Sequence, residues 1–304
     1  MIYNIHHRTT YTSTTPITFA RCVLRLTPRS TNSQTVFQSS VSVSPAPSQS
    51  VRRTGPFGEE VLTVVVEKPH RALVIDARSR IDAHAASLDL LSDGPAWETV
   101  RDLSFAAQDI GVDSPASYLY PTSRTPILPQ ITDYARESFA AERPVVEAVS
   151  ELMRRMYDDF AYDPEATSVS TPIREAFENR HGVCQDFTHI MIAALRGLGL
   201  PASYVSGYLR TIPPPGKPRL EGADATHAWV RVWCGAQDGW IGFDPTNAIL
   251  TRDDHITLAV GRDYGDVAPV DCIILSAGEQ ELDVEVDVVP ETGSSTLQPI
   301  AFGR

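Results

Sequence analysis

A cysteine, a histidine and an aspartate in the second half of the chain are of the types that perform covalent acyl transfer. Cys184 stands at the start of a predicted helix, His227 lies in the apolar run THAWVRVW, and Asp244 ends the run WIGFD. A thiolate attacks carbonyl carbon, a histidine holds the thiolate and carries the proton, and a carboxylate orients the imidazole. These residue types predict a thiol nucleophile with its base and its orienting acid, provided that the fold brings them together.

The stretch GVCQDFTHIMIAALRGLGL predicts the helix that positions the cysteine. Its apolar residues recur with the period of a helix and form one buried stripe: Phe187, Ile190, Met191, Ala194, Leu195 and Leu198. Gly197, Gly199 and Pro201 mark its end. Cys184 therefore lies in the first turn, where unpaired backbone N–H groups and the helix dipole favour a thiolate.

Two strands joined by a tight turn are predicted to carry the histidine and the aspartate. The pair Asp238-Gly239, between the two apolar runs, is typical of a hairpin turn. With the turn just before this pair, His227 lies roughly opposite Thr246 and diagonal to Asp244, a separation that side chains bridge. A proline follows Asp244 and restricts its backbone to extended conformations.

The first part of the chain predicts an all-β domain. Short alternating runs, at residues 2–11, 36–43, 61–66 and 72–75, are separated by residues typical of turns. Residues 1–80 carry ten Lys and Arg against four Asp and Glu, whereas the whole chain has a net charge of -12. This shift in charge favours a boundary near residues 85–90. We expect a sandwich or barrel over residues 1–88.

The rest of the chain predicts a helical bridging segment followed by a mixed core. Residues 89–143 contain short helices broken by prolines, and a clear amphipathic helix begins at Pro144. We expect the core to span residues 144–304. The alternating run at residues 280–290 must pair with one of the two sheets, and we assign it to the core sheet. The predicted fold class is α+β, with a central helix packed on an antiparallel sheet.

Composition limits the partners and the compartment. The acidic second part lacks the concentrated basic surface that nucleic acid requires. No run of 18 apolar residues is present, and the start lacks the apolar core of a signal peptide. We expect a cytoplasmic protein with a protein or peptide substrate, no nucleic-acid partner and no membrane partner, and leave its oligomeric state open. The four cysteines lie far apart without a CxxC pair, which favours reduced thiols.

The same residues carry a resemblance to a known family. The segments GVCQDFTHIMIAALRGLGLPASYVSGYL, THAWVRVW and WIGFDPTN resemble, in order, three blocks of the bacterial transglutaminase-like superfamily. The early segments LRLTPR and PFGEEV resemble the β-rich domain that precedes such cores in bacteria. The resemblance covers most of the chain and implies a papain-like core, with Cys184, His227 and Asp244 as nucleophile, base and orienting acid. It implies no calcium regulation and leaves the acyl acceptor, water or amine, open.

Three more residues are candidates for the oxyanion site or the cleft. The backbone N–H of Cys184 is expected to be one oxyanion donor, and the side chain of Gln185 is a candidate for the second. Trp229 shares a strand face with His227 and is a candidate to shield it from water. Tyr208 is a candidate either for packing or for the cleft lining.

Other functions are compatible with these residues. A hydrolytic cysteine peptidase or amidase is the alternative within the enzymes. A metal-binding protein would use Cys184, His181, His189 and His227, although His189 lies well around the helix from Cys184 and favours a packing role. We expect no cofactor and no metal. A catalytically idle binding or scaffold module is the third possibility, and the presence of all three chemical residue types favours an enzyme over it.

Overall fold

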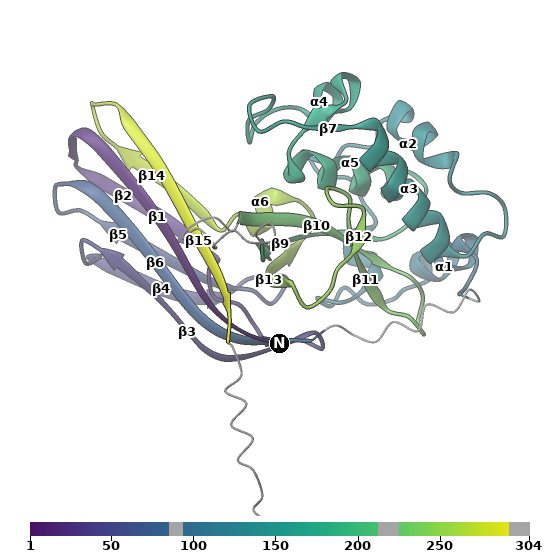
Figure 1. Cartoon of the computed structure of the whole chain (residues 1–304), viewed down its shortest axis with the longest axis horizontal. Helices are drawn as coiled ribbons and strands as arrows, with labels where there is room; N and C mark the ends of the chain where they lie inside the picture. The colour runs from purple at the N-terminus through teal and green to yellow at the C-terminus, as the bar shows by residue number, and fades with distance from the viewer. Residues whose placement is uncertain (85–93, 212–224, 292–304) are drawn as a thin grey trace, which may run out of the picture.

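The computed structural model describes residues 1–84, 94–211 and 225–291. It consists of a β sandwich beside a mixed core of helices and an antiparallel sheet (Figure 1). The predicted fold class, an α+β core preceded by a β-rich domain, is confirmed. The predicted boundary between residues 88 and 89 lies outside the described residues, so the division into 1–88, 89–143 and 144–304 stays a prediction.

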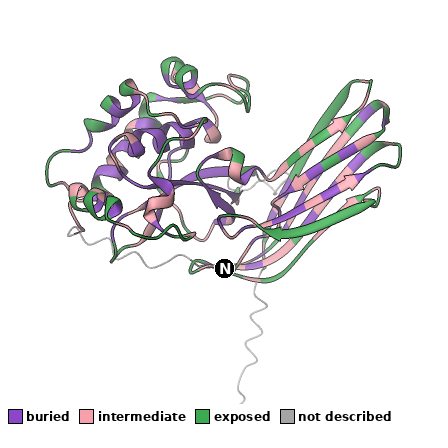
Figure 2. Cartoon of the chain, turned by 180° about the vertical axis from the view of Figure 1, so that it is seen from behind, coloured by how far each residue is buried: buried purple, intermediate pink, exposed green. Residues whose placement is uncertain are grey.

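Two four-stranded sheets form the sandwich, in the orders β15-β1-β6-β3 and β14-β2-β5-β4. The strands come from both ends of the chain: β1 (Ile2–Ile17), β2 (Phe19–Leu24), β3 (Gln34–Ser44), β4 (Gln49–Thr54), β5 (Glu60–Val66), β6 (His70–Ala83), β14 (Val270–Leu275) and β15 (Gln280–Pro290). Alternate side chains point inward, so Tyr3, Leu73 and Ile75 are fully buried. The edge strands β3 and β4 are mostly exposed (Figure 2).

The prediction that residues 280–290 pair with the core sheet is wrong. β15 pairs antiparallel with β1, from Tyr3 opposite Pro290 to Ser13 opposite Gln280. The side chain of Val286 on β15 packs in the core of the sandwich. The strand β14 belongs to the same sandwich, because it pairs with β2. Alternation in the sequence correctly indicates a half-buried strand. It does not indicate the partner, because the pattern of one strand is equally compatible with either sheet.

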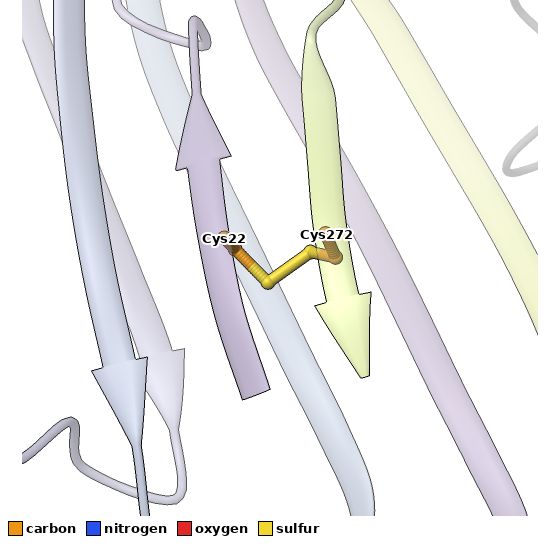
Figure 3. Close-up of a disulfide and its surroundings, with 2 residues drawn as sticks. All are labelled: Cys22 and Cys272. Carbon is orange, nitrogen blue, oxygen red and sulfur yellow. A yellow bond between two sulfur atoms is a disulfide. The ribbon is translucent and has the colours of Figure 1, made fainter. Parts of the chain in front are cut away.

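The prediction of reduced cysteines is wrong for two of the four. Cys22 on β2 and Cys272 on β14 form a disulfide (Figure 3). The two residues lie directly opposite each other in the strand register. Sequence spacing conceals this pairing because 250 residues separate them. Cys184 and Cys234 are free thiols.

Replacing both Cys22 and Cys272 by alanine should lower the free energy of unfolding by about 2 to 5 kcal/mol, because the disulfide closes a long loop in the unfolded chain. Urea unfolding followed by circular dichroism, with and without dithiothreitol, measures the change. The reductant should destabilise the native chain and leave the double variant unaffected. A reductant effect of equal size on the double variant would contradict this account.

The core sheet has five strands in the order β12-β11-β10-β9-β13. Their bounds are β9 (Ala202–Leu209), β10 (Ala225–Trp233), β11 (Trp240–Asp244), β12 (Ile249–Leu250) and β13 (His255–Gly261). The helices and the remaining short strands are α1 (Trp97–Phe105), η1 (Pro115–Tyr118), α2 (Pro129–Arg136), α3 (Val145–Asp159), β7 (Ala161–Tyr162), α4 (Ile173–Asn179), β8 (His181–Gly182), α5 (Cys184–Gly197) and α6 (Tyr264–Val267). Among the helices of the described ranges, none combines the length and the apolar character needed to cross a bilayer.

The central helix is α5, as the sequence predicts. It packs against β9 and β10 and contacts α2 and α4. Every residue from Asp186 to Arg196 is buried. A helix covered on all sides is held firmly, so its first residue, Cys184, has a fixed position.

Candidate active site

The turn that leads into α5 places Cys184, which is half-buried. The carboxylate of Asp186 accepts the backbone N–H of Val183 at 2.9 Å and the hydroxyl of Thr167 at 2.6 Å. A Cβ at Gly182 would lie 2.6 Å from that carboxylate, so the close approach requires glycine. Asp186 therefore stabilises the helix start, where a carboxylate complements the dipole, and fixes the turn that presents the thiol.

The hairpin of β10 and β11 brings His227 and Asp244 together in the predicted register. Val230 lies opposite Phe243, and His227 Nε2 lies 2.9 Å from Asp244 Oδ2. Cys184 and His227 line the same pocket, and the interaction with Cys184 contributes to a raised pKa of His227. Because Nε2 faces the carboxylate, the second ring nitrogen is the one left for the thiol. The structure thus brings all three predicted residues side by side.

Charge is stabilised on both members of the buried pair. Burial opposes a charged His227, but its hydrogen bond to Asp244 and its interaction with Cys184 outweigh burial and raise the pKa of His227 to about 10. Burial also opposes an ionised Asp244, yet hydrogen bonds from His227 and His255 hold the pKa of this carboxyl well below its ordinary value. Imidazolium and carboxylate therefore coexist at neutral pH. An imidazolium beside a thiol favours the thiolate, which is the nucleophilic form.

Two residues that the sequence analysis missed complete the surroundings of Asp244. His255 Nε2 lies 3.1 Å from Oδ2, and Asn247 Nδ2 donates to the same oxygen at 2.7 Å. The backbone N–H groups of Thr246 and Asn247 reach Oδ1 at 3.0 and 3.3 Å. The carboxylate is therefore held by donors on both oxygens, which fixes its orientation toward His227.

The sequence contained a signal for Asn247 and none for His255. Asn247 follows Asp244 by three residues in DPTN, a composition typical of a turn in which the aspartate accepts backbone N–H groups. His255 lies on β13, which pairs with β9 and not with the hairpin that carries Asp244. A contact of this kind depends on strand order, which no local pattern specifies.

Trp229 covers one side of the histidines. Its ring centroid lies 6.2 Å from that of His227 and 5.2 Å from that of His255. A Cβ at Gly207 on the neighbouring strand would lie 2.5 Å from the Trp229 ring, so glycine makes room for it. The tryptophan is buried. Its position fits the predicted shielding of the imidazole from water.

The two remaining cleft candidates lie in different places. Gln185 lines a pocket of about 280 Å³ beside Cys184, and its side-chain Nε2 donates to the carbonyl of Val169 at 3.3 Å. Tyr208 is fully buried, and its hydroxyl lies 2.9 Å from His7 Nδ1 of the sandwich. The structure therefore places Tyr208 in packing between the core and the sandwich. Tyr204, four residues earlier on β9, is the tyrosine of this pair that lines the pocket.

A metal is a further chemical possibility for donors this close together. Within the described ranges, His227, Asp244 and His255 offer donor atoms that all lie within 4.8 Å of one another. The backbone N–H of Arg252 donates to His255 Nδ1 at 3.3 Å, so the ring proton of His255 is on Nε2 and points to Asp244. In this tautomer His255 has no free lone pair for a metal. The arrangement is that of a hydrogen-bonded cluster.

The donor set considered from the sequence differs from this cluster. Of Cys184, His181, His189 and His227, only His227 belongs to it. His189 Nε2 accepts the backbone N–H of Tyr264 at 3.2 Å, and burial lowers the pKa of His189 to about 4. His189 is thus a neutral, hydrogen-bonded packing residue, as its position on the helix predicts.

A helix that begins with a cysteine, packed on an antiparallel sheet that carries a paired histidine and aspartate, defines the class of papain-like thiol-enzyme cores. Family models for the bacterial transglutaminase-like N-terminal region and for the transglutaminase-like superfamily match residues 3–82 and 132–245, respectively. The chain belongs to the transglutaminase-like superfamily, whose members are typically cysteine-based enzymes.

Relatives match nearly the whole chain. An uncharacterized protein of Mycobacterium tuberculosis is 40% identical over 305 residues, which cover 96% of this chain and 94% of the relative. One of Mycobacterium leprae is 31% identical over 287 residues, 93% of this chain and 96% of its own length. A solved structure from Cytophaga hutchinsonii, named a candidate cysteine protease, aligns with a TM-score of 0.71 at 19% identity over 97% of this chain and 92% of that one. The fold, including the sandwich, is therefore shared.

Proposed function

We propose that this protein is a thiol enzyme that forms an acyl-cysteine intermediate on a glutamine side chain or peptide amide and passes the acyl group to an amine or to water. One observation carries the proposal. Cys184 begins α5 and lines one pocket with His227, whose Nε2 is held 2.9 Å from Asp244 Oδ2. The arrangement supplies a nucleophile, a proton carrier and an orienting acid at one site.

In acylation, a C–S bond to Cys184 replaces the C–N bond of the amide, and one proton moves to the leaving nitrogen. The Cys184 thiolate attacks the amide carbonyl carbon, the C–S bond forms, and the carbonyl oxygen becomes an oxyanion. The N–H of Cys184 belongs to the first turn of α5, where the helix itself supplies no acceptor, so it is free to stabilise that oxygen. Gln185 is the proposed second donor, after its side chain leaves Val169. The His227 imidazolium then protonates the nitrogen, the C–N bond breaks, and ammonia or an amine departs.

Deacylation reverses the roles of the same groups. Neutral His227 takes a proton from water or from an amine, which attacks the thioester carbonyl carbon. The C–S bond breaks, and the thiolate–imidazolium pair is restored. Water as the acceptor gives a peptidase or amidase, and an amine gives a transglutaminase reaction. Comparing ammonia release with amine incorporation on one glutamine peptide measures the partition.

Selective alkylation tests the reactive thiol. Brief substoichiometric iodoacetamide should label Cys184 in preference to Cys234 at neutral pH, because Cys184 lies in the pocket beside His227. Cys234 is an internal control, since it is fully buried and burial raises the pKa of its thiol far above the ordinary value. Intact-mass analysis followed by peptide mapping locates the label. Equal labelling of the two thiols would favour an idle scaffold module.

A further inference from the structure

The pocket beside Cys184 is bounded by two parts of the molecule. Cys184 and His227 lie on the core side, and β1 and β15 of the sandwich lie on the other. β15 is the sandwich strand that runs along the side facing the core (Figure 1). The sandwich therefore contributes a wall to the pocket in which the thiol reacts.

Along one face of β15, the side chains change from buried to exposed. Val286 and Val288 point inward and are 1% and 0% exposed, whereas Leu282 and Val284, on the same face of β15, are 55% and 45% exposed. In the register, Leu282 lies opposite Tyr11 and Val284 opposite Thr9. The apolar row thus continues from the sandwich core into the pocket, where nothing in the described chain covers it. Uncovered apolar side chains on an edge strand are a liability unless a partner covers them.

Among the described residues that line the pocket, none carries a formal charge apart from the reacting pair. The described residues around it include no Asp, Glu, Lys or Arg. His7, at one end, is bonded through Nδ1 to the Tyr208 hydroxyl and through Nε2 to the Thr9 hydroxyl, each at 2.9 Å. Burial lowers the pKa of His7 to about 4, so this ring is neutral. A charged substrate side chain would therefore find no opposite charge among these described residues, whereas an apolar one needs no hydrogen-bond partner.

We propose that the sandwich wall formed by Tyr11, Leu282 and Val284 binds an aliphatic or aromatic side chain of the substrate next to the amide that acylates Cys184. The inference rests on the proposed function and names the substrate feature that the site selects. A volume of about 280 Å³ is just below that of sites for whole small molecules, which suits one or two side chains of a peptide. An apolar contact of this kind changes kcat/KM by roughly 10- to 200-fold.

Alkylating probes test the wall without knowledge of the natural substrate. N-benzyl-iodoacetamide and N-(2-hydroxyethyl)-iodoacetamide carry the same reactive group, and their rates of labelling Cys184 are divided by their rates with free glutathione. The benzyl probe should label Cys184 at least about 10-fold faster after this correction. The Leu282→Ser/Val284→Thr variant should lose that preference and retain the rate with the hydroxyethyl probe.

Leu275→Ser is the matched control, because Leu275 is 54% exposed on β14, the strand that precedes β15 in the chain, but does not line the pocket. It should keep the benzyl preference. Glutamine peptides that differ only in a flanking leucine or serine should show the same pattern in acyl-enzyme formation.

Each contrary outcome has a separate meaning. If neither probe alkylates Cys184, the proposed function is wrong. If it labels readily but without benzyl preference, or if Leu275→Ser loses the preference equally, the wall is overturned and the thiol chemistry stands. A change in oligomeric mass on replacing Leu282 and Val284, measured by analytical ultracentrifugation, would also overturn it, because a second copy of the chain would then be what covers the strand.

Discussion

The Cys184→Ala variant is expected to form no acyl-enzyme and to lose peptide-amide turnover by at least about 10⁴-fold, because no other group at the site is able to form the thioester. Mass spectrometry of the protein mixed with substrate detects the acyl adduct, and ammonia release measures turnover. Alanine is a good helix former, so the melting temperature should stay close to that of the native chain.

Cys234→Ala is the control for loss of a thiol, because Cys234 is buried away from the pocket. It should retain the acyl adduct even if its melting temperature falls. Turnover by Cys184→Ala above about 1% of the native rate would rule out the covalent mechanism.

The Asp244→Asn variant should lose about 10³- to 10⁴-fold in kcat and should change the pH profile. Asp244 is a main reason why the pKa of His227 is raised to about 10, against the effect of burial, which lowers it. The imidazolium therefore persists as pH rises, and activity is lost only as pH passes through that value. Without the carboxylate, burial still lowers the pKa, so the alkaline limb of kcat/KM against pH should move to lower pH.

Variants of His255, which also contacts Asp244, should show a smaller effect than Asp244→Asn. His255→Ala removes one donor to Asp244 and leaves the carboxylate in contact with His227. Its effect on kcat should be much smaller, about 10-fold, and His255→Gln, which restores an N–H donor, should recover part of it. An alkaline limb that stays in place in Asp244→Asn would show that the carboxylate does not control the protonation of His227.

The predicted site residues came together because each is specified by local sequence. Cys184 is placed by a helix start, and His227 and Asp244 are placed by the register of a single hairpin. Helix periodicity and hairpin turns are local patterns, and they predict relative positions over short stretches. Of the contacts that escaped prediction, that of Asn247 with Asp244 is also local, and the others are of another kind.

His255, the Cys22–Cys272 disulfide and β15 reach their partners through strand order in the folded sheets. Such pairings join residues far apart in the chain, and the alternation of each strand is compatible with several partners. The cytoplasmic location stays a prediction, and the disulfide weighs against it, since disulfides persist mainly in oxidising compartments.

The completion of the sandwich by β14 and β15 has a consequence for synthesis on the ribosome. The strands β1 and β2 emerge first, but their outer neighbours are among the last strands of the described chain to be made. The elements of the core, up to the end of β13, are all available earlier. In the growing chain, the edges of β1 and β2 therefore stay unpaired while the core folds. The site around Cys184 is also complete before the β15 wall that is proposed to select the substrate. Full selectivity belongs only to the finished polypeptide.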